Sequence, residues 1–125
     1  MLTGCSLLTA PGGEAADARG SWQYTGTQSA PTLQLQGTME ITQQSGEAIG
    51  GTASWEEHDG IGVVGMDGGT VAGRVIGESD VDFDVITPAG DRRHVGRLTA
   101  DTMTGAWVQL PGGESGEFRA VRTAP

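Results

Sequence analysis

The chain has 125 residues, of which 22 are glycine, and its formal net charge is −9. This length provides for one domain, and so much glycine disfavours long helices, because each glycine in a helix interior costs about 1 kcal/mol. All seven basic residues are arginine. We see no basic face of the kind that nucleic acids or anionic bilayers require. No apolar run approaches the ~18 residues of a membrane-spanning helix.

The first feature along the chain is its single cysteine, Cys5. Leu2-Thr3-Gly4-Cys5 resembles the bacterial lipobox, the site at which signal peptidase II cuts and the cysteine is lipidated. The resemblance implies that Cys5 anchors a lipoprotein to the membrane of a bacterial cell envelope. Ser6 after the cysteine resembles the outer-membrane sorting signal of Gram-negative bacteria. The alternative is a chance match in a cytosolic protein.

Only four residues precede Cys5, which is fewer than the charged and apolar regions of a signal peptide need. We therefore interpret residues 1–19 as a truncated signal and lipobox followed by a flexible linker. The segment from Ser6 to Gly20 is rich in Ala, Gly, Thr and Pro and has no hydrophobic period. This composition predicts a disordered tether ahead of the domain.

From Gly20 onward, apolar and polar residues alternate in short runs, which is typical of half-buried strands. The runs centre on residues 22–24, 33–41, 49–55, 71–75, 81–85, 94–98, 103–109 and 118–120. Short turn segments separate them, so successive strands are expected to be antiparallel neighbours. We predict an all-β domain over residues 20–125, an antiparallel up-and-down meander barrel of about eight short strands.

Two hairpin registers would keep the inward faces of neighbouring strands together. One pairs Val75 with Val81, and the next pairs Val85 with His94. Both place a glycine opposite Phe83, an arrangement that helps to fix the register of a sheet.

The ends of the domain carry a further resemblance. Gly20-Ser21-Trp22 lies on the first strand and the segment from Phe118 to Arg122 on the last. This is similar to the pattern of the calycins, which include lipocalins, fatty-acid-binding proteins and avidins. The resemblance implies that the Trp22 indole packs at the closed end of the barrel. It also implies that Arg119 or Arg122 covers that indole, a favourable cation–π contact.

The calycin-like pattern and an aromatic inward face favour a non-enzymatic binding module for a small apolar ligand or lipid. We expect the ligand to contact four inward residues: Tyr24, Trp55, His94 and Trp107. For His94 the alternative is a core histidine satisfied by Tyr24 or by a backbone carbonyl. No catalytic constellation can be assembled, because no nucleophile partner for either histidine is evident, so we do not expect an enzyme.

The Gly-rich segment 56–69 is expected to be a mobile lid or contact surface at one end of the barrel. Four of its apolar residues have no evident core partner: Ile61, Val63, Val64 and Met66. The alternative function follows from this surface. It is an envelope protein–protein interaction module or a protease-inhibitor barrel, with a solid core and with loops that make the contacts.

Three motifs in the chain are not expected to hold a metal or a cofactor. The acidic run from Glu56 to Asp59 has no second ligand pair at a recognisable spacing. Residues 80–91 lack the glycine and the glutamate of an EF-hand loop. The glycine motif in residues 60–65 is not followed by a helix that could bind a pyrophosphate.

Overall fold

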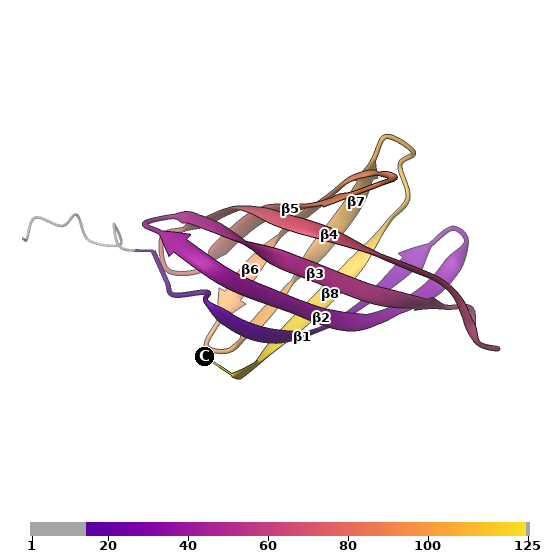
Figure 1. Cartoon of the computed structure of the whole chain (residues 1–125), viewed down its shortest axis with the longest axis horizontal. Helices are drawn as coiled ribbons and strands as arrows, with labels where there is room; N and C mark the ends of the chain where they lie inside the picture. Colours follow the sequence, from indigo (N-terminus) through magenta and orange to yellow (C-terminus); the bar gives the residue numbers. More distant parts are fainter. Residues whose placement is uncertain (1–14, 125) are drawn as a thin grey trace, which may run out of the picture.

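The computed structural model describes residues 15–124, which form a closed antiparallel barrel with the strands in chain order (Figure 1). The strands are β1 (Gly20–Ser29), β2 (Thr32–Ser45), β3 (Ala48–His58), β4 (Val63–Ile76), β5 (Asp80–Thr87), β6 (Gly90–Thr99), β7 (Thr102–Leu110) and β8 (Ser115–Ala124). β8 pairs with β1 and closes the barrel. The predicted fold class is confirmed. In the described part of the chain, no helix is long and apolar enough to cross a membrane.

The alternation of apolar and polar residues maps onto the two faces of the sheet, because successive side chains of a strand point to opposite sides. Within the predicted alternating runs the large apolar side chains that point inward are buried, except that of Leu33 near the rim, which is half-buried. The largest fully buried side chains include Trp22, Trp55, Trp107, Tyr24 and Phe83. These bulky side chains pack against one another inside the barrel, as expected for a small eight-stranded barrel.

One predicted register is confirmed and the other is wrong by two residues. Val75 pairs with Val81 as expected. In the next hairpin Phe83, not Val85, lies opposite His94. The reason is the turn, which is two residues shorter than expected: Thr87 pairs with Gly90 directly. A shift of two residues leaves every side chain on its own face, so the inward set is unchanged.

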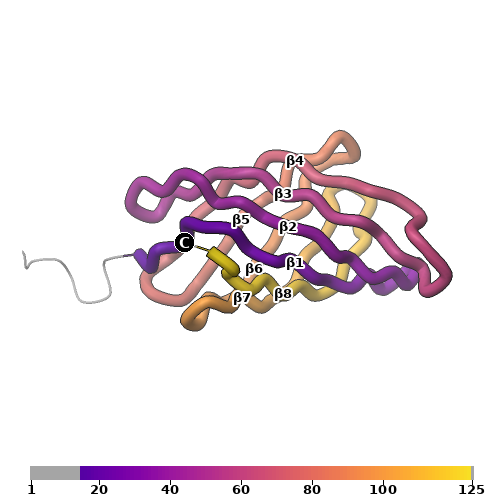
Figure 2. Tube along the Cα trace, turned by 60° about the horizontal axis from the view of Figure 1, so that its bottom comes forward, coloured from indigo at the N-terminus to yellow at the C-terminus, as the bar shows by residue number. Residues whose placement is uncertain are grey.

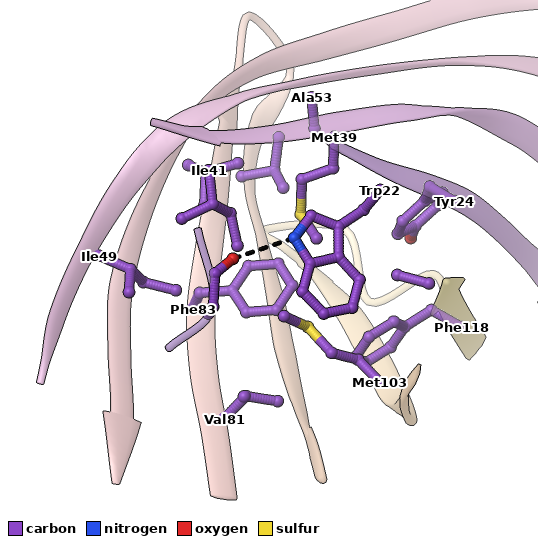
Figure 3. Close-up of a cluster of buried hydrophobic side chains, with 14 of the residues drawn as sticks. Trp22, Tyr24, Met39, Ile41, Ile49, Ala53, Val81, Phe83, Met103 and Phe118 are labelled. Carbon is purple, nitrogen blue, oxygen red and sulfur yellow. Dashed lines mark hydrogen bonds between the residues drawn. The ribbon is translucent and has the colours of Figure 1, made fainter. Parts of the chain in front are cut away.

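The closed end of the barrel is covered by the segment of residues 15–19 that precedes β1. Ala18 is fully buried there, and the Trp22 Nε1–H donates to its carbonyl oxygen at 3.0 Å (Figure 3). The amide of Gln44 holds the same segment through both its oxygen, which accepts from Ala18 N, and its nitrogen, which donates to Ala16 O. Residues 15–19 are therefore packed, and their assignment to a flexible linker is corrected. The rest of the predicted tether, with Cys5, lies outside the described residues.

The segment expected to be a mobile lid is mostly strand. β3 continues to His58 and β4 begins at Val63, so only residues 59–62 form the connection. The pairing of β3 with β4 continues from Glu56 opposite Met66 to His58 opposite Val63. Glycine content favoured a loop, but Gly65, Gly68 and Gly69 lie within β4 and only Gly60 and Gly62 lie in the connection. The result is a long hairpin at one end of the barrel.

Candidate binding site

The candidate site lies at the open end, defined here as the end where the β1–β2, β3–β4, β5–β6 and β7–β8 connections meet solvent (Figure 1). The meander topology sends alternate connections to alternate ends, so these four share one rim. The other end is the one that residues 15–19 cover.

The four predicted ligand-contacting residues do lie together, inside the barrel. The Tyr24 and Trp55 rings stack with centroids 5.6 Å apart. The imidazole of His94 stacks on Phe83 at 4.6 Å. Tyr24 Oη lies 2.9 Å from His94 Nε2. Trp107 is also buried, closer to the rim. These side chains fill the interior of the barrel and pack against other core side chains.

His94 is held as a neutral ring. Its Nδ1 lies 2.9 Å from the carbonyl oxygen of Arg92, which can only accept, so Nδ1 carries the proton and Nε2 accepts from the Tyr24 hydroxyl. Burial lowers the pKa of His94 to about 3. Burial also raises the pKa of Tyr24. This geometry is that of a core histidine whose two ring nitrogens are both hydrogen-bonded, which is the alternative that the sequence analysis gave for His94.

Above this core, a buried arginine lies between two indoles. The Arg92 guanidinium carbon is 4.0 Å from the Trp107 ring centroid and 4.8 Å from that of Trp55. Arg92 is only 4% exposed, and its Nε donates to Gln109 Oε1 at 3.2 Å. Burial lowers the pKa of Arg92, and the Glu57, Asp67 and Glu114 carboxylates oppose that shift. A cation flanked by two aromatic faces is favourable in such a site.

Two buried donors in this layer have no hydrogen-bond partner among the described residues. They are Arg92 Nη1 and the amide nitrogen Gln109 Nε2. Gln109 is 5% exposed, so neither side chain projects freely into solvent. The Trp107 indole is satisfied separately, since its Nε1 donates to Thr27 O at 3.0 Å. The layer therefore contains two buried hydrogen-bond donors that no described residue satisfies.

Sequence reasoning did not assign Arg92 and Gln109 to the site. The period of two contained the signal, since Arg92 lies two residues before the inward His94 and Gln109 two residues after the inward Trp107. Polar side chains carry no hydrophobic signal, so the pattern alone does not indicate that these two side chains belong to a binding layer.

A hollow of about 1160 Å³ lies on the outer surface, where the β1–β2 and β7–β8 hairpins diverge beyond the last β1–β8 pair, Gly26 with Phe118. Its lining includes outward residues of both hairpins and Ile61 of the β3–β4 connection. None of the four predicted ligand-contacting residues lines it. The sequence pattern gave no signal for this groove.

The four predicted loop contacts are all exposed, Ile61 at 97%, Met66 at 75%, Val64 at 54% and Val63 at 53%. Ile61 lies in the connection, whereas the other three belong to β4. In the same hairpin His58 Nε2 lies 3.3 Å from Glu56 Oε1. No group of three His, Cys, Asp or Glu side chains within residues 15–124 could hold a metal ion.

Comparison with known proteins gives the fold alone. No protein-family model matches the chain, and no curated protein matches it. Solved structures do match. A de novo designed fluorescence-activating β-barrel has a TM-score of 0.63 and 17% identity over 84% of this chain and 93% of its own.

Two further designed barrels are similar, and both are described as bound to the small molecule DFHBI. EF1p2_mFAP2b has a TM-score of 0.65 and 17% identity over 85% of this chain and 94% of its own. The redesigned barrel mFAP0 has a TM-score of 0.63 and 20% identity over 84% of this chain and 98% of its own. At these identities the likeness extends to the eight-stranded barrel and no further.

Proposed function

We propose that this chain is a non-enzymatic binding module whose open end binds a small, mainly apolar ligand or lipid that carries one hydrogen-bond acceptor. The observation that carries the proposal is the pair of unpartnered buried donors, Arg92 Nη1 and Gln109 Nε2, beside two indoles. The described binding of DFHBI by two similar barrels supports it, since it shows that such a barrel can hold a small molecule.

The two donors favour a ligand that offers an oxygen. A buried donor without a partner costs about 1–3 kcal/mol, and a carbonyl or ester oxygen at the rim recovers part of that cost. Glu57, Asp67 and Glu114 act on Arg92 from the same region. Three carboxylates near one guanidinium disfavour a strongly anionic ligand and favour a neutral acceptor.

The donor pair defines the first experiment. Native mass spectrometry of protein purified from its own host should show a carried-over lipid or other small molecule. Arg92→Met should abolish the carry-over, whereas Arg93→Met should retain it, because Arg93 is on the outer face and pairs with Asp82. Protein that carries nothing from its host, and whose melting temperature no fatty acid, fatty alcohol or ester raises, would overturn the proposal.

We also propose that the barrel is a lipoprotein of a bacterial cell envelope, anchored through Cys5. The support is the lipobox-like Leu2-Thr3-Gly4-Cys5 and its position ahead of the domain. Metabolic labelling with a radioactive fatty acid should mark the full-length gene product and should be lost in Cys5→Ser. Labelling that persists in Cys5→Ser would contradict the anchor and would leave the ligand proposal to its own test.

A second candidate function is the binding of a protein partner. The exposed apolar side chains of the β3–β4 hairpin favour it, above all Ile61 and Met66. In this function the packed interior serves as a scaffold, and deletion of the hairpin tip abolishes the interaction while the barrel stays folded.

A further inference from the structure

The β3–β4 hairpin extends beyond the neighbouring β5–β6 hairpin. β4 begins at Val63, but its pairing with β5 begins only at Thr70, opposite Ile86. On its other side the same stretch of β4 is paired with β3 as far as His58. In Figures 1 and 2 the tips of the two hairpins lie apart at the same end of the barrel. One edge of β4, from Val63 to Gly68, therefore has no neighbouring strand, whereas Gly69 already packs against Ile86 of β5; we call it the β4 edge.

The backbone of the β4 edge presents hydrogen-bonding groups outward. Val75 N donates to Glu47 O on the β3 side. Because the groups of an antiparallel strand alternate between its two neighbours, residues of even number point to the β5 side. The N–H and C=O of Met66 therefore face the side where β5 is absent. The N–H of Gly68, which faces the same way, is held by the Asp67 carboxylate at 2.8 Å.

The side chains on this edge are apolar and exposed. Val64 is 54% exposed and Met66 is 75% exposed, although both lie within a strand. A long, exposed and apolar strand edge is a template for pairing with another chain, and proteins usually protect such an edge with lysine, proline or a covering element. The β4 edge has none of these, and Asp67 blocks one donor only.

The charge of the hairpin defines the kind of strand that fits. Residues 56–67 contain Glu56, Glu57, Asp59 and Asp67 and no arginine. A second copy of the chain would bring the same carboxylates alongside, and like charges on paired strands are destabilising. An anionic bilayer is disfavoured for the same reason. A segment with basic side chains would instead be attracted electrostatically by all four carboxylates.

We propose that the β4 edge binds an extended, basic segment of a partner protein, which adds to the barrel as a further strand. Backbone hydrogen bonds to Met66 provide affinity, and contacts with Val64 and Met66 side chains together with the acidic neighbours provide selectivity. The site is separate from the donor pair at Arg92, so it goes beyond the small-ligand function.

The probe for this site is a fluorescent peptide that alternates valine with lysine, and its control alternates valine with glutamate. We expect the basic peptide to bind at least about tenfold more tightly than the acidic one at low salt, with the difference shrinking as salt rises. In hydrogen exchange, the Met66 amide should be slowed when the basic peptide is bound.

Two substitutions of Met66 distinguish the contribution of backbone hydrogen bonds from that of side-chain contacts. Met66→Pro removes the outward N–H, and an edge position tolerates proline because no β3 bond is lost. Met66→Pro should weaken binding of the basic peptide at least about tenfold. Met66→Ala keeps the N–H and should weaken binding by a smaller factor. Circular dichroism and melting temperature report whether each variant folds.

If Met66→Pro fails to fold, two N-methylated versions of the basic peptide test the backbone pairing in its place, each with its N-methyl groups along one of the two backbone edges. The peptide methylated on the edge that pairs with β4 should lose binding, and the other peptide should keep it. Equal binding by both, or by Met66→Pro and the wild type, would overturn the proposal. Sedimentation as a dimer through this hairpin, or pelleting with phosphatidylglycerol vesicles in place of peptide binding, would overturn it as well.

Discussion

The guanidinium of Arg122 lies 4.7 Å above the ring of Trp22. The same side chain donates from Nη1 to the carbonyl oxygens of Asp17 and Arg19, and from Nε to the carboxylate of Asp101. One residue of the last strand thus joins the segment ahead of β1, the first strand and the β6–β7 turn. Of the two arginines that the calycin resemblance offered, Arg122 is the one that covers the indole.

Arg122→Met should lower the free energy of unfolding by about 2–3 kcal/mol, because the cation–π contact and several hydrogen bonds at the closed end are lost together. Urea unfolding followed by tryptophan fluorescence measures the change. Arg119→Met is the control, since Arg119 is exposed on the same strand, and it should stay within about 0.5 kcal/mol of the wild type. Equal effects of the two substitutions would contradict the role of Arg122.

Phe83→Ala should lower the free energy of unfolding by about 3–5 kcal/mol, the range for deletion of a buried aromatic side chain. Phe83 is 1% exposed and stacks on His94, so its removal leaves a cavity in the middle of the core. Ile86→Ala on the same strand is the control, because Ile86 is 48% exposed. A near-neutral Phe83→Ala would show that the interior is not packed as described.

Stability should fall on acidification because of His94. Its pKa is about 3 in the folded chain and 6.5 without the fold, so the unfolded state binds the proton first. The contribution of neutral His94 is complete above pH 6.5 and is lost as the pH falls towards 3. By pH 5 this loss amounts to about 2 kcal/mol.

His94→Gln should remove that part of the pH dependence between pH 8 and pH 5, whatever its effect on absolute stability. Ile86→Ala, which alters an exposed side chain that does not titrate, should retain the wild-type slope. Chemical denaturation at several pH values measures both slopes. A His94→Gln slope equal to that of the wild type would refute the assignment.

Gly105→Ala should be strongly destabilising, with a loss of several kcal/mol or a failure to fold. Gly105 lies opposite Gly96 across the β6–β7 pair, and a Cβ there would lie 2.1 Å from Val95 O and 2.5 Å from the Gly96 Cα. Gly62→Ala is the matched control, because nothing lies within 4 Å of its Cβ position. Melting temperatures of the two variants should differ clearly, and similar values would count against this close approach of the strands.

Much of the barrel follows from side-chain period alone. The period of two assigns residues to a face, and a register error of two residues leaves that assignment intact, as His94 shows by staying inward opposite Phe83. The number of residues in the turn sets the register itself. A turn at Pro88 and Ala89 could not be distinguished from a longer one by the apolar pattern.

The candidate site was less predictable than the fold. The inward aromatic residues were assigned from their period, but the donors that distinguish the rim, Arg92 and Gln109, are polar and carry no hydrophobic signal. The β4 edge depends on where β5 stops relative to β4, which is a relation between two strands. No single segment of the sequence contains it.

The packing of residues 15–19 across one end has a consequence for how the molecule faces its surroundings. The chain enters the barrel at the sealed end, where Ala18 contacts Trp22, and Arg92 and Met66 lie towards the opposite end. Ten peptide units separate Cys5 from Ala15, a reach of at most about 35 Å. Under the anchoring proposed for Cys5, the barrel would be tethered to its membrane from the sealed end. The open end and the β4 edge would then be turned towards molecules that approach from the aqueous side.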